Sequence, residues 1–131
     1  MIKRQGLEQK VTYNLVPLDL EEVAEPSAHP YADAIAGFPP KSFDWILVDG
    51  MVRLTCFRNA LDKLKPGGLL ILDNANRYVP NAWDGRHSTV HEPRDKPRTA
   101  GWADAMNQIA PWRAILTSDG IWDTRFWQKP M

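Results

Sequence analysis

One stretch, residues 43–74, constrains the fold of this chain more than any other part. It contains two short apolar runs, FDWILVDG from residue 43 and LLILDN from residue 69. Short continuous apolar runs that end in polar residues are typical of buried parallel strands. Parallel neighbours need a crossover connection, which is usually a helix. The stretch therefore predicts a strand-helix-strand unit in an α/β domain.

The segment between the two runs has the periodicity of an amphipathic helix. Apolar side chains recur at positions i, i+3, i+4 and i+7, and these are Phe57, Ala60, Leu61 and Leu64. The sequence PGG at residues 66–68 then predicts the end of this helix, because glycine accepts the left-handed backbone angles that other residues avoid. The single cysteine, Cys56, lies next to the apolar stripe, which predicts a buried and inert thiol.

Polar side chains follow both predicted strands. Asp49 follows the first strand, and Asp73 and Asn74 follow the second. The carboxyl ends of parallel strands meet at one edge of a sheet, where α/β proteins bind ligands, so these side chains should lie together. Their oxygens suit a hard cation such as Mg²⁺. The alternative is that they only cap loops and helix ends.

The same residues carry a resemblance to a known family. The sequence FDWILVDG, followed by LKPGGLLILDN and then by Arg77-Tyr78, resembles the fourth and fifth strands of class I S-adenosylmethionine-dependent methyltransferases. A looser resemblance extends over residues 11–128. It implies an α/β, Rossmann-like methyltransferase fold that is truncated, with a mostly parallel sheet and a C-terminal antiparallel hairpin.

The resemblance also implies a function. The chain would transfer a methyl group from S-adenosylmethionine to an oxygen or nitrogen atom of a small-molecule acceptor, and it would be incomplete on its own. The alternative is a non-catalytic remnant of the fold that serves oligomerisation or small-ligand binding. Cofactor contacts are expected from Asp19, Asp49 and Gly50, and substrate contacts from Arg53, Arg77 and Tyr78.

Asp49, Asp73 and Asn74 resemble the metal-binding set of the metal-dependent O-methyltransferases, which implies Mg²⁺ as a second cofactor. Those enzymes have a lysine three residues after the first aspartate, and this chain has Val52 there. Arg53 follows, but a permanently charged guanidinium cannot act as a base at neutral pH. The expected catalytic residues are therefore Asp49 and His87, because an imidazole can serve as a general base near pH 7.

One part of the family's pattern is absent from this sequence. Complete enzymes have an early strand that leads into a glycine-rich turn, and none of the eight glycines here forms a G-x-G. In the family's strand order, 3-2-1-4-5-7-6, the two missing strands would lie in the middle of the sheet. Their loss would leave a strand edge unpaired. We therefore expect a homodimer, a missing amino-terminal half, or a shift of residues 11–18 into the gap.

The rest of the chain predicts a single partial domain over residues 1–131. Its other expected elements are a polar tail (1–10), a strand (11–18), a short helix (31–36), a long irregular loop (75–98), a helix (99–109) and a hairpin of two strands (113–117 and 124–128). The hairpin signal is the dipeptide Asp119-Gly120 between two strand-like runs.

The composition discourages several classes of partner. Sixteen basic and sixteen acidic residues cancel, so no general attraction to nucleic acid or to an anionic membrane is expected. The apolar runs are too short to cross a membrane, and a single cysteine cannot form an internal disulfide. These features favour a cytoplasmic, reducing setting and a small-molecule substrate.

Overall fold

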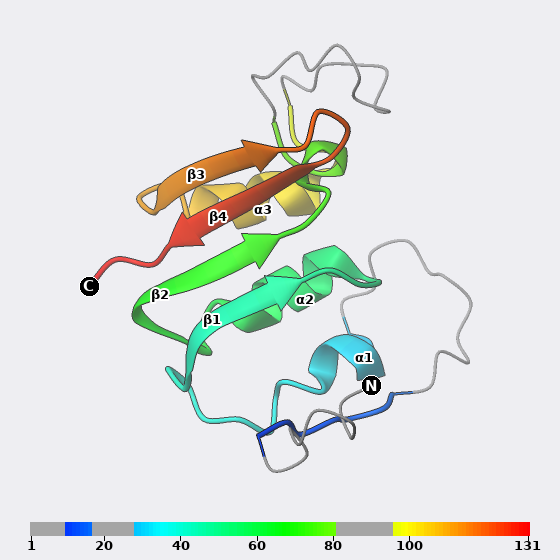
Figure 1. Cartoon of the computed structure of the whole chain (residues 1–131), viewed down its shortest axis with the longest axis vertical. Helices are drawn as coiled ribbons and strands as arrows, with labels where there is room; N and C mark the ends of the chain where they lie inside the picture. The colour runs from blue at the N-terminus through cyan, green and yellow to red at the C-terminus, as the bar shows by residue number, and fades with distance from the viewer. Residues whose placement is uncertain (1–9, 17–27, 81–95) are drawn as a thin grey trace.

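The computed structural model describes residues 10–16, 28–80 and 96–131, and its centre is a four-stranded sheet in the order β1-β2-β4-β3 (Figure 1). The strands are β1 (Phe43–Val48), β2 (Leu64–Leu72), β3 (Arg113–Ser118) and β4 (Asp123–Gln128). The helices are α1 (Pro30–Asp33), α2 (Arg53–Ala60) and α3 (Ala100–Gln108), with a short 3₁₀ turn, η2 (Ala75–Arg77). None of the described helices is long and apolar enough to cross a membrane.

The sheet is mixed, and the mostly parallel sheet of a truncated Rossmann-like methyltransferase fold is a wrong prediction. β1 and β2 are parallel, with α2 between them in the chain. β4, however, is antiparallel to both β2 and β3. The hairpin of β3 and β4 was expected, but the parallel part of the sheet is smaller than expected, because residues 11–16 add no strand beside β1 and β2.

The connection from α2 to β2 also differs from the prediction. α2 ends at Ala60, before Leu64, and Leu64 begins β2 with its side chain fully buried. The sequence PGG at residues 66–68 lies inside β2, where the pairing with β1 shifts register. Gly67 has a φ of 76°, which glycine adopts without strain. The glycines therefore serve a bulge in the sheet and not the end of a helix.

Residues 11–16 do not form the predicted strand, although residues 17–18 lie outside the described part of the chain. Tyr13 and Leu15 are exposed. Alternating residues form a strand only where a neighbouring strand pairs with them, and the sheet places no strand beside this segment. α1 is shorter than the helix expected at residues 31–36. The expected loop at residues 75–98 begins with η2, and its residues 81–95 lie outside the described part of the chain. Of the expected tail at residues 1–10, only residue 10 is described.

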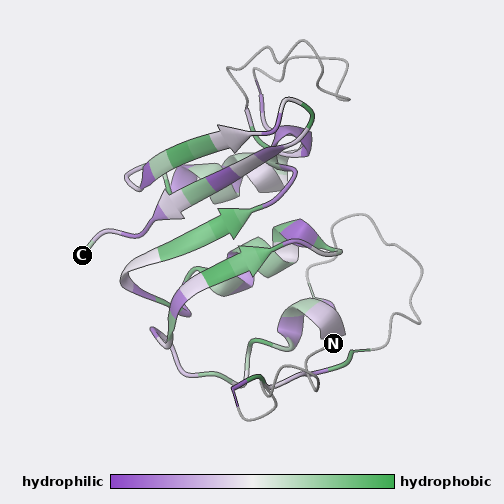
Figure 2. Cartoon of the chain, viewed as in Figure 1, coloured by the Kyte–Doolittle hydropathy of each residue, from purple (hydrophilic) through white to green (hydrophobic). Residues whose placement is uncertain are grey.

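One face of the sheet packs against α2 and α3, and this contact is the hydrophobic core. Phe57 of α2 lies edge-on to Trp102 of α3 and to Trp127 of β4, with ring centroids 5.4 Å apart in each pair. Figure 2 shows β1 and most of β2 in the colour of apolar residues. The core therefore fixes the two helices and the strands β1, β2 and β4 relative to one another.

The other face of the sheet carries an apolar row that remains exposed. Leu47, Ile71, Phe126 and Ile115 are opposite one another in register across all four strands. Residues opposite one another in register point to the same face. Together with two neighbours they form the open apolar face, which consists of Trp45, Leu47, Leu69, Ile71, Ile115 and Phe126. Trp45 is 62% exposed and Leu47 is 50% exposed.

Candidate functional site

β1 and β2 end side by side and bring the predicted polar residues to one edge. Val48 is opposite Leu72, so Asp49 and Asp73 leave the sheet as neighbours. The main-chain N–H of Asp73 donates to the carbonyl of Val48 at 3.2 Å, which extends the parallel ladder beyond the strands. Asn74 has a φ of 49° and turns the chain into η2. The parallel pairing therefore places all three polar residues at the same edge.

Arg53, the first residue of α2, lies among these residues and binds their oxygens. Its Nη2 donates to Oδ1 of Asp49 at 3.1 Å, and its Nη1 donates to Oδ1 of Asn74 at 3.1 Å and to the main-chain carbonyl of Asp73. Its Nε donates to the carbonyl of Gly50 at 2.8 Å. We call this set of four contacts the Arg53 clamp. Because most N–H groups of the guanidinium already donate to the chain's own oxygens, few remain for the predicted contact with substrate.

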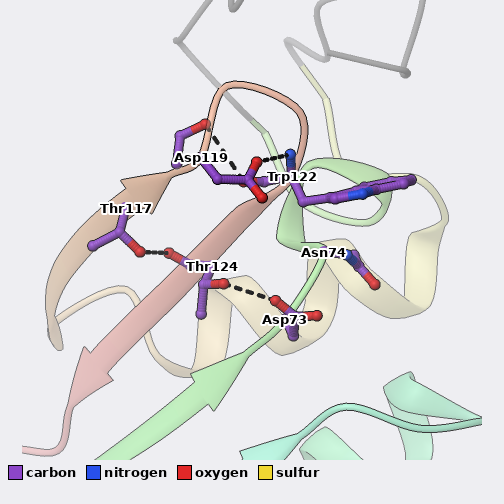
Figure 3. A pocket seen from close by; sticks show the side chains of 7 residues that line it. Asp73, Asn74, Thr117, Asp119, Trp122 and Thr124 are labelled. Atoms are coloured by element: carbon purple, nitrogen blue, oxygen red, sulfur yellow. Dashed lines mark hydrogen bonds between the residues drawn. The ribbon is translucent and has the colours of Figure 1, made fainter. Parts of the chain in front are cut away.

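These residues, as they are arranged, do not fit a divalent cation. Mg²⁺ requires an octahedral shell of oxygens at about 2.1 Å. One carboxylate oxygen of Asp49 and the amide oxygen of Asn74 bind the Arg53 guanidinium. The Asp73 carboxylate accepts a hydrogen bond from Oγ1 of Thr124 at 2.7 Å (Figure 3). A metal ion at this position would lie against a fixed positive charge. The Mg²⁺ prediction therefore requires Arg53 to move away.

An open polar cavity of about 360 Å³ lies where β2 ends, next to the turn of the hairpin (Figure 3). It is lined by Asp73, Asn74, Thr117, Ser118, Asp119, Trp122 and Thr124. The walls combine two carboxylates, one amide, three hydroxyls and one indole, and such walls can accept hydrogen bonds from a small polar molecule. The cavity shares Asp73 and Asn74 with the strand edge.

The hairpin side of this cavity is organised by Asp119. Its Oδ1 accepts hydrogen bonds from the main-chain N–H groups of Ile121 at 2.8 Å and Trp122 at 2.7 Å. These hydrogen bonds lower the pKa of Asp119, so its carboxylate is ionised at neutral pH. Sequence reasoning identified Asp119-Gly120 as a turn and did not connect it with Asp73. The connection depends on the pairing of β4 with β2, which no local signal reveals.

The other residues that were predicted to contact cofactor or substrate, where described, lie against side chains of the chain itself. A Cβ atom on Gly50 would lie 2.2 Å from the Tyr31 hydroxyl, so α1 covers the position expected to face the cofactor. The Arg77 guanidinium lies 4.6 Å from the ring centroid of Trp122, and the Tyr78 ring lies 5.2 Å from that of Trp102. Asp19 and His87 lie outside the described residues, so their predicted roles stay predictions.

Cys56 lies in α2, three residues after Arg53. Burial raises its pKa to about 11, and its Sγ donates to the carbonyl of Met51 at 3.5 Å. A thiol with this pKa stays protonated at neutral pH, and only the thiolate is a good nucleophile or metal ligand. Within the described residues, no group of three or more His, Cys, Asp or Glu side chains is placed to share a metal ion.

Comparison with known proteins assigns no family to this chain. No protein-family model matches it, and no curated protein matches it. One solved structure that resembles it is described as a possible exported protein from Bordetella parapertussis. The two sequences are 18% identical, the TM-score is 0.44, and the match covers 70% of this chain and 40% of the other. This chain therefore spans about 40% of that protein, and a TM-score this low assigns neither fold nor activity.

Proposed function

We propose that this chain forms one wall of the ligand site of an S-adenosylmethionine-dependent, methyltransferase-like enzyme that modifies an oxygen or nitrogen atom of a small molecule. The observation that carries the proposal is the convergence of Asp49, Asp73 and Asn74 at the carboxyl ends of two parallel strands, beside an open polar cavity. Ligands of α/β sheets bind at such edges. A second copy or a separate amino-terminal half would supply the remaining walls.

Asp49 is the residue best placed to contact the cofactor. Its side chain is 51% exposed, and Arg53 holds one of its oxygens. A carboxylate fixed in this way can accept hydrogen bonds from the hydroxyl or ammonium groups of a ligand. When bound, S-adenosylmethionine supplies an activated methyl group on its sulfonium. Contact with Gly50 requires the Tyr31 hydroxyl to move.

Asp73, Asn74 and Thr124 form the wall on which an acceptor would lie. The Thr124 hydroxyl donates to Asp73, and this hydrogen bond fixes the orientation of the carboxylate toward β4. The acceptor would then bind Asp73 through its own hydroxyl or amine donors, because an ionised carboxylate only accepts hydrogen bonds. His87 stays the proposed general base.

Replacing Asp49 by asparagine should weaken binding of S-adenosylmethionine and S-adenosylhomocysteine about tenfold or more, because a charge-assisted hydrogen bond contributes roughly 1.5–3 kcal/mol. Isothermal titration calorimetry on the folded chain measures this effect. Asp104→Asn is the matched control, because Asp104 is an exposed carboxylate on α3. An unchanged affinity in Asp49→Asn would contradict the proposal, and the absence of any binding heat with the folded wild-type chain would rule out cofactor binding by this chain alone.

A second candidate function, self-association, is favoured by the open apolar face. An exposed apolar patch that extends across a whole sheet is typical of an interaction surface. A second copy of this chain is the occupant we propose, because the row Leu47, Ile71, Phe126 and Ile115 extends across all four strands and can pack against itself around a two-fold axis. The same contact would cover Trp45 in both copies.

Replacing Leu47 by lysine should convert the dimer to a monomer, because each interface would then bury two charges without partners. Light scattering after size-exclusion chromatography measures the mass directly. Asn107→Lys provides the control, because Asn107 is exposed on α3, on the opposite side of the sheet. A wild-type chain that is monomeric at high concentration would rule out this candidate and leave the cofactor proposal untouched.

A further inference from the structure

The Arg53 clamp joins parts of the chain that belong to three different structural segments. The four oxygens that it binds come from the end of β1, the turn before α2 and the end of β2. They are one carboxylate oxygen, one amide oxygen and two main-chain carbonyls. These are the types of ligand that Mg²⁺ and Ca²⁺ use in proteins. At this edge, however, they all bind one guanidinium.

The guanidinium is held in this position by the backbone and by its surroundings. Val52 has a φ of 42° and directs the chain sharply into α2, so that Arg53 faces back toward Asp49 four residues earlier. The Arg53 side chain is only 11% exposed, and its Cζ lies 5.6 Å from the ring centroid of Tyr78. A guanidinium that is this well buried and hydrogen-bonded is costly to displace, because the four oxygens that it binds would lose their hydrogen-bond donors.

We propose that Arg53 is the built-in cation of this edge and that it excludes divalent metal ions from Asp49, Asp73 and Asn74. The positive charge that these oxygens require comes from the chain itself. Any ligand that binds Asp49 would then do so without Mg²⁺ or Ca²⁺. This inference concerns the metal alone, and it holds whether or not the edge binds S-adenosylmethionine.

The planar fork of arginine is essential to this role. It reaches oxygens on both strand ends at once, whereas the ammonium of a lysine is a single point of charge. Arg53 is thus a positioning residue for Asp49, because it fixes one carboxylate oxygen and leaves the exposed side of the group toward solvent. Its removal should leave a set of oxygens without a cation, which a divalent ion can then bind.

The test is a titration of the full chain with MgCl₂ and CaCl₂, without any organic ligand. The wild-type chain should show no binding heat and no change in its unfolding temperature. Arg53→Met, which keeps much of the side-chain volume without the charge, should bind Ca²⁺ or Mg²⁺ and unfold several degrees higher when the ion is added. Adding Asp49→Asn to Arg53→Met should weaken that binding about tenfold or more.

Arg58→Met is the matched control. Arg58 is also in α2, but its side chain is exposed and bonds to Gly101 on α3, so its loss should not create a metal site. Circular dichroism confirms that each variant is folded. If Arg53→Met does not fold, Arg53→Ala with the Asp49→Asn comparison replaces it.

Two results would overturn the inference. One is binding of Mg²⁺ or Ca²⁺ by the wild-type chain that Asp49→Asn abolishes. The other is a folded Arg53 variant that gains no binding of either ion. Neither result depends on S-adenosylmethionine, so the failure of this inference and the failure of the proposed function are distinguishable.

Discussion

Phe57→Ala is expected to lower the free energy of unfolding by about 3–5 kcal/mol, which is the largest single effect we predict for this chain. The Phe57 side chain has no exposed surface and contacts Trp102 and Trp127 edge-on. Its removal leaves a cavity between α2, α3 and β4 that rigid aromatic neighbours cannot fill. Since a domain is stable by only about 5–15 kcal/mol, this variant loses a large share of its stability.

Urea denaturation followed by circular dichroism measures this loss. Phe38→Ala is the matched control, because Phe38 is the same residue type but lies outside both the core and the open apolar face. It is partly exposed, so its replacement should cost much less. Equal losses in the two variants would show that the core does not lie between the sheet and the helices α2 and α3.

Gly68→Ala is expected to lower the free energy of unfolding by about 1–3 kcal/mol, the usual cost of overpacking a rigid site. A Cβ atom at Gly68 would lie 2.9 Å from the carbonyl oxygen of Lys65 and 3.0 Å from that of Asp44. Both contacts are with backbone, which cannot rotate away as a side chain can. The bulge of β2 would have to shift, and with it the pairing of β1 that places Asp49 at the edge.

Thermal or urea unfolding of Gly68→Ala measures this cost against Gly37→Ala. Gly37 has no heavy atom within 4 Å of an added Cβ, so alanine should change stability there by at most about 0.5 kcal/mol. If Gly68→Ala were as stable as the wild-type chain, the bulge would have to be more adaptable than its contacts indicate.

Several elements could be predicted from the sequence because their signals are local. Residues 99–109 were expected to be helical, and α3 occupies Ala100–Gln108 with the Thr99 side chain accepting a hydrogen bond from the N–H of Trp102. The hairpin forms around Asp119-Gly120, where Gly120 has a φ of 93°. Caps and turns depend on neighbouring residues only, so a single sequence contains the information.

Elements that depend on distant partners were predicted less well. The segment at residues 11–16 alternates as a strand does, yet it has no strand structure, because the pattern cannot supply a neighbour. The sequence PGG at residues 66–68 suits a helix end and a bulge equally, and only the pairing of β2 with β1 decides between them. The sheet has only one parallel pair of strands for a similar reason, since residues 11–16 find no neighbouring strand and add nothing to the parallel pair of β1 and β2.

The sequence by itself determined that Asp49, Asp73 and Asn74 meet, because two apolar strands joined by a helix must run parallel and end together. Only the tertiary structure decided what these residues bind. The φ of 42° at Val52 and the side-by-side ends of β1 and β2 bring the Arg53 guanidinium within hydrogen-bonding distance of oxygens up to 21 positions away in the chain. A contact of that kind depends on backbone angles and strand register, which residue types at fixed spacing do not specify.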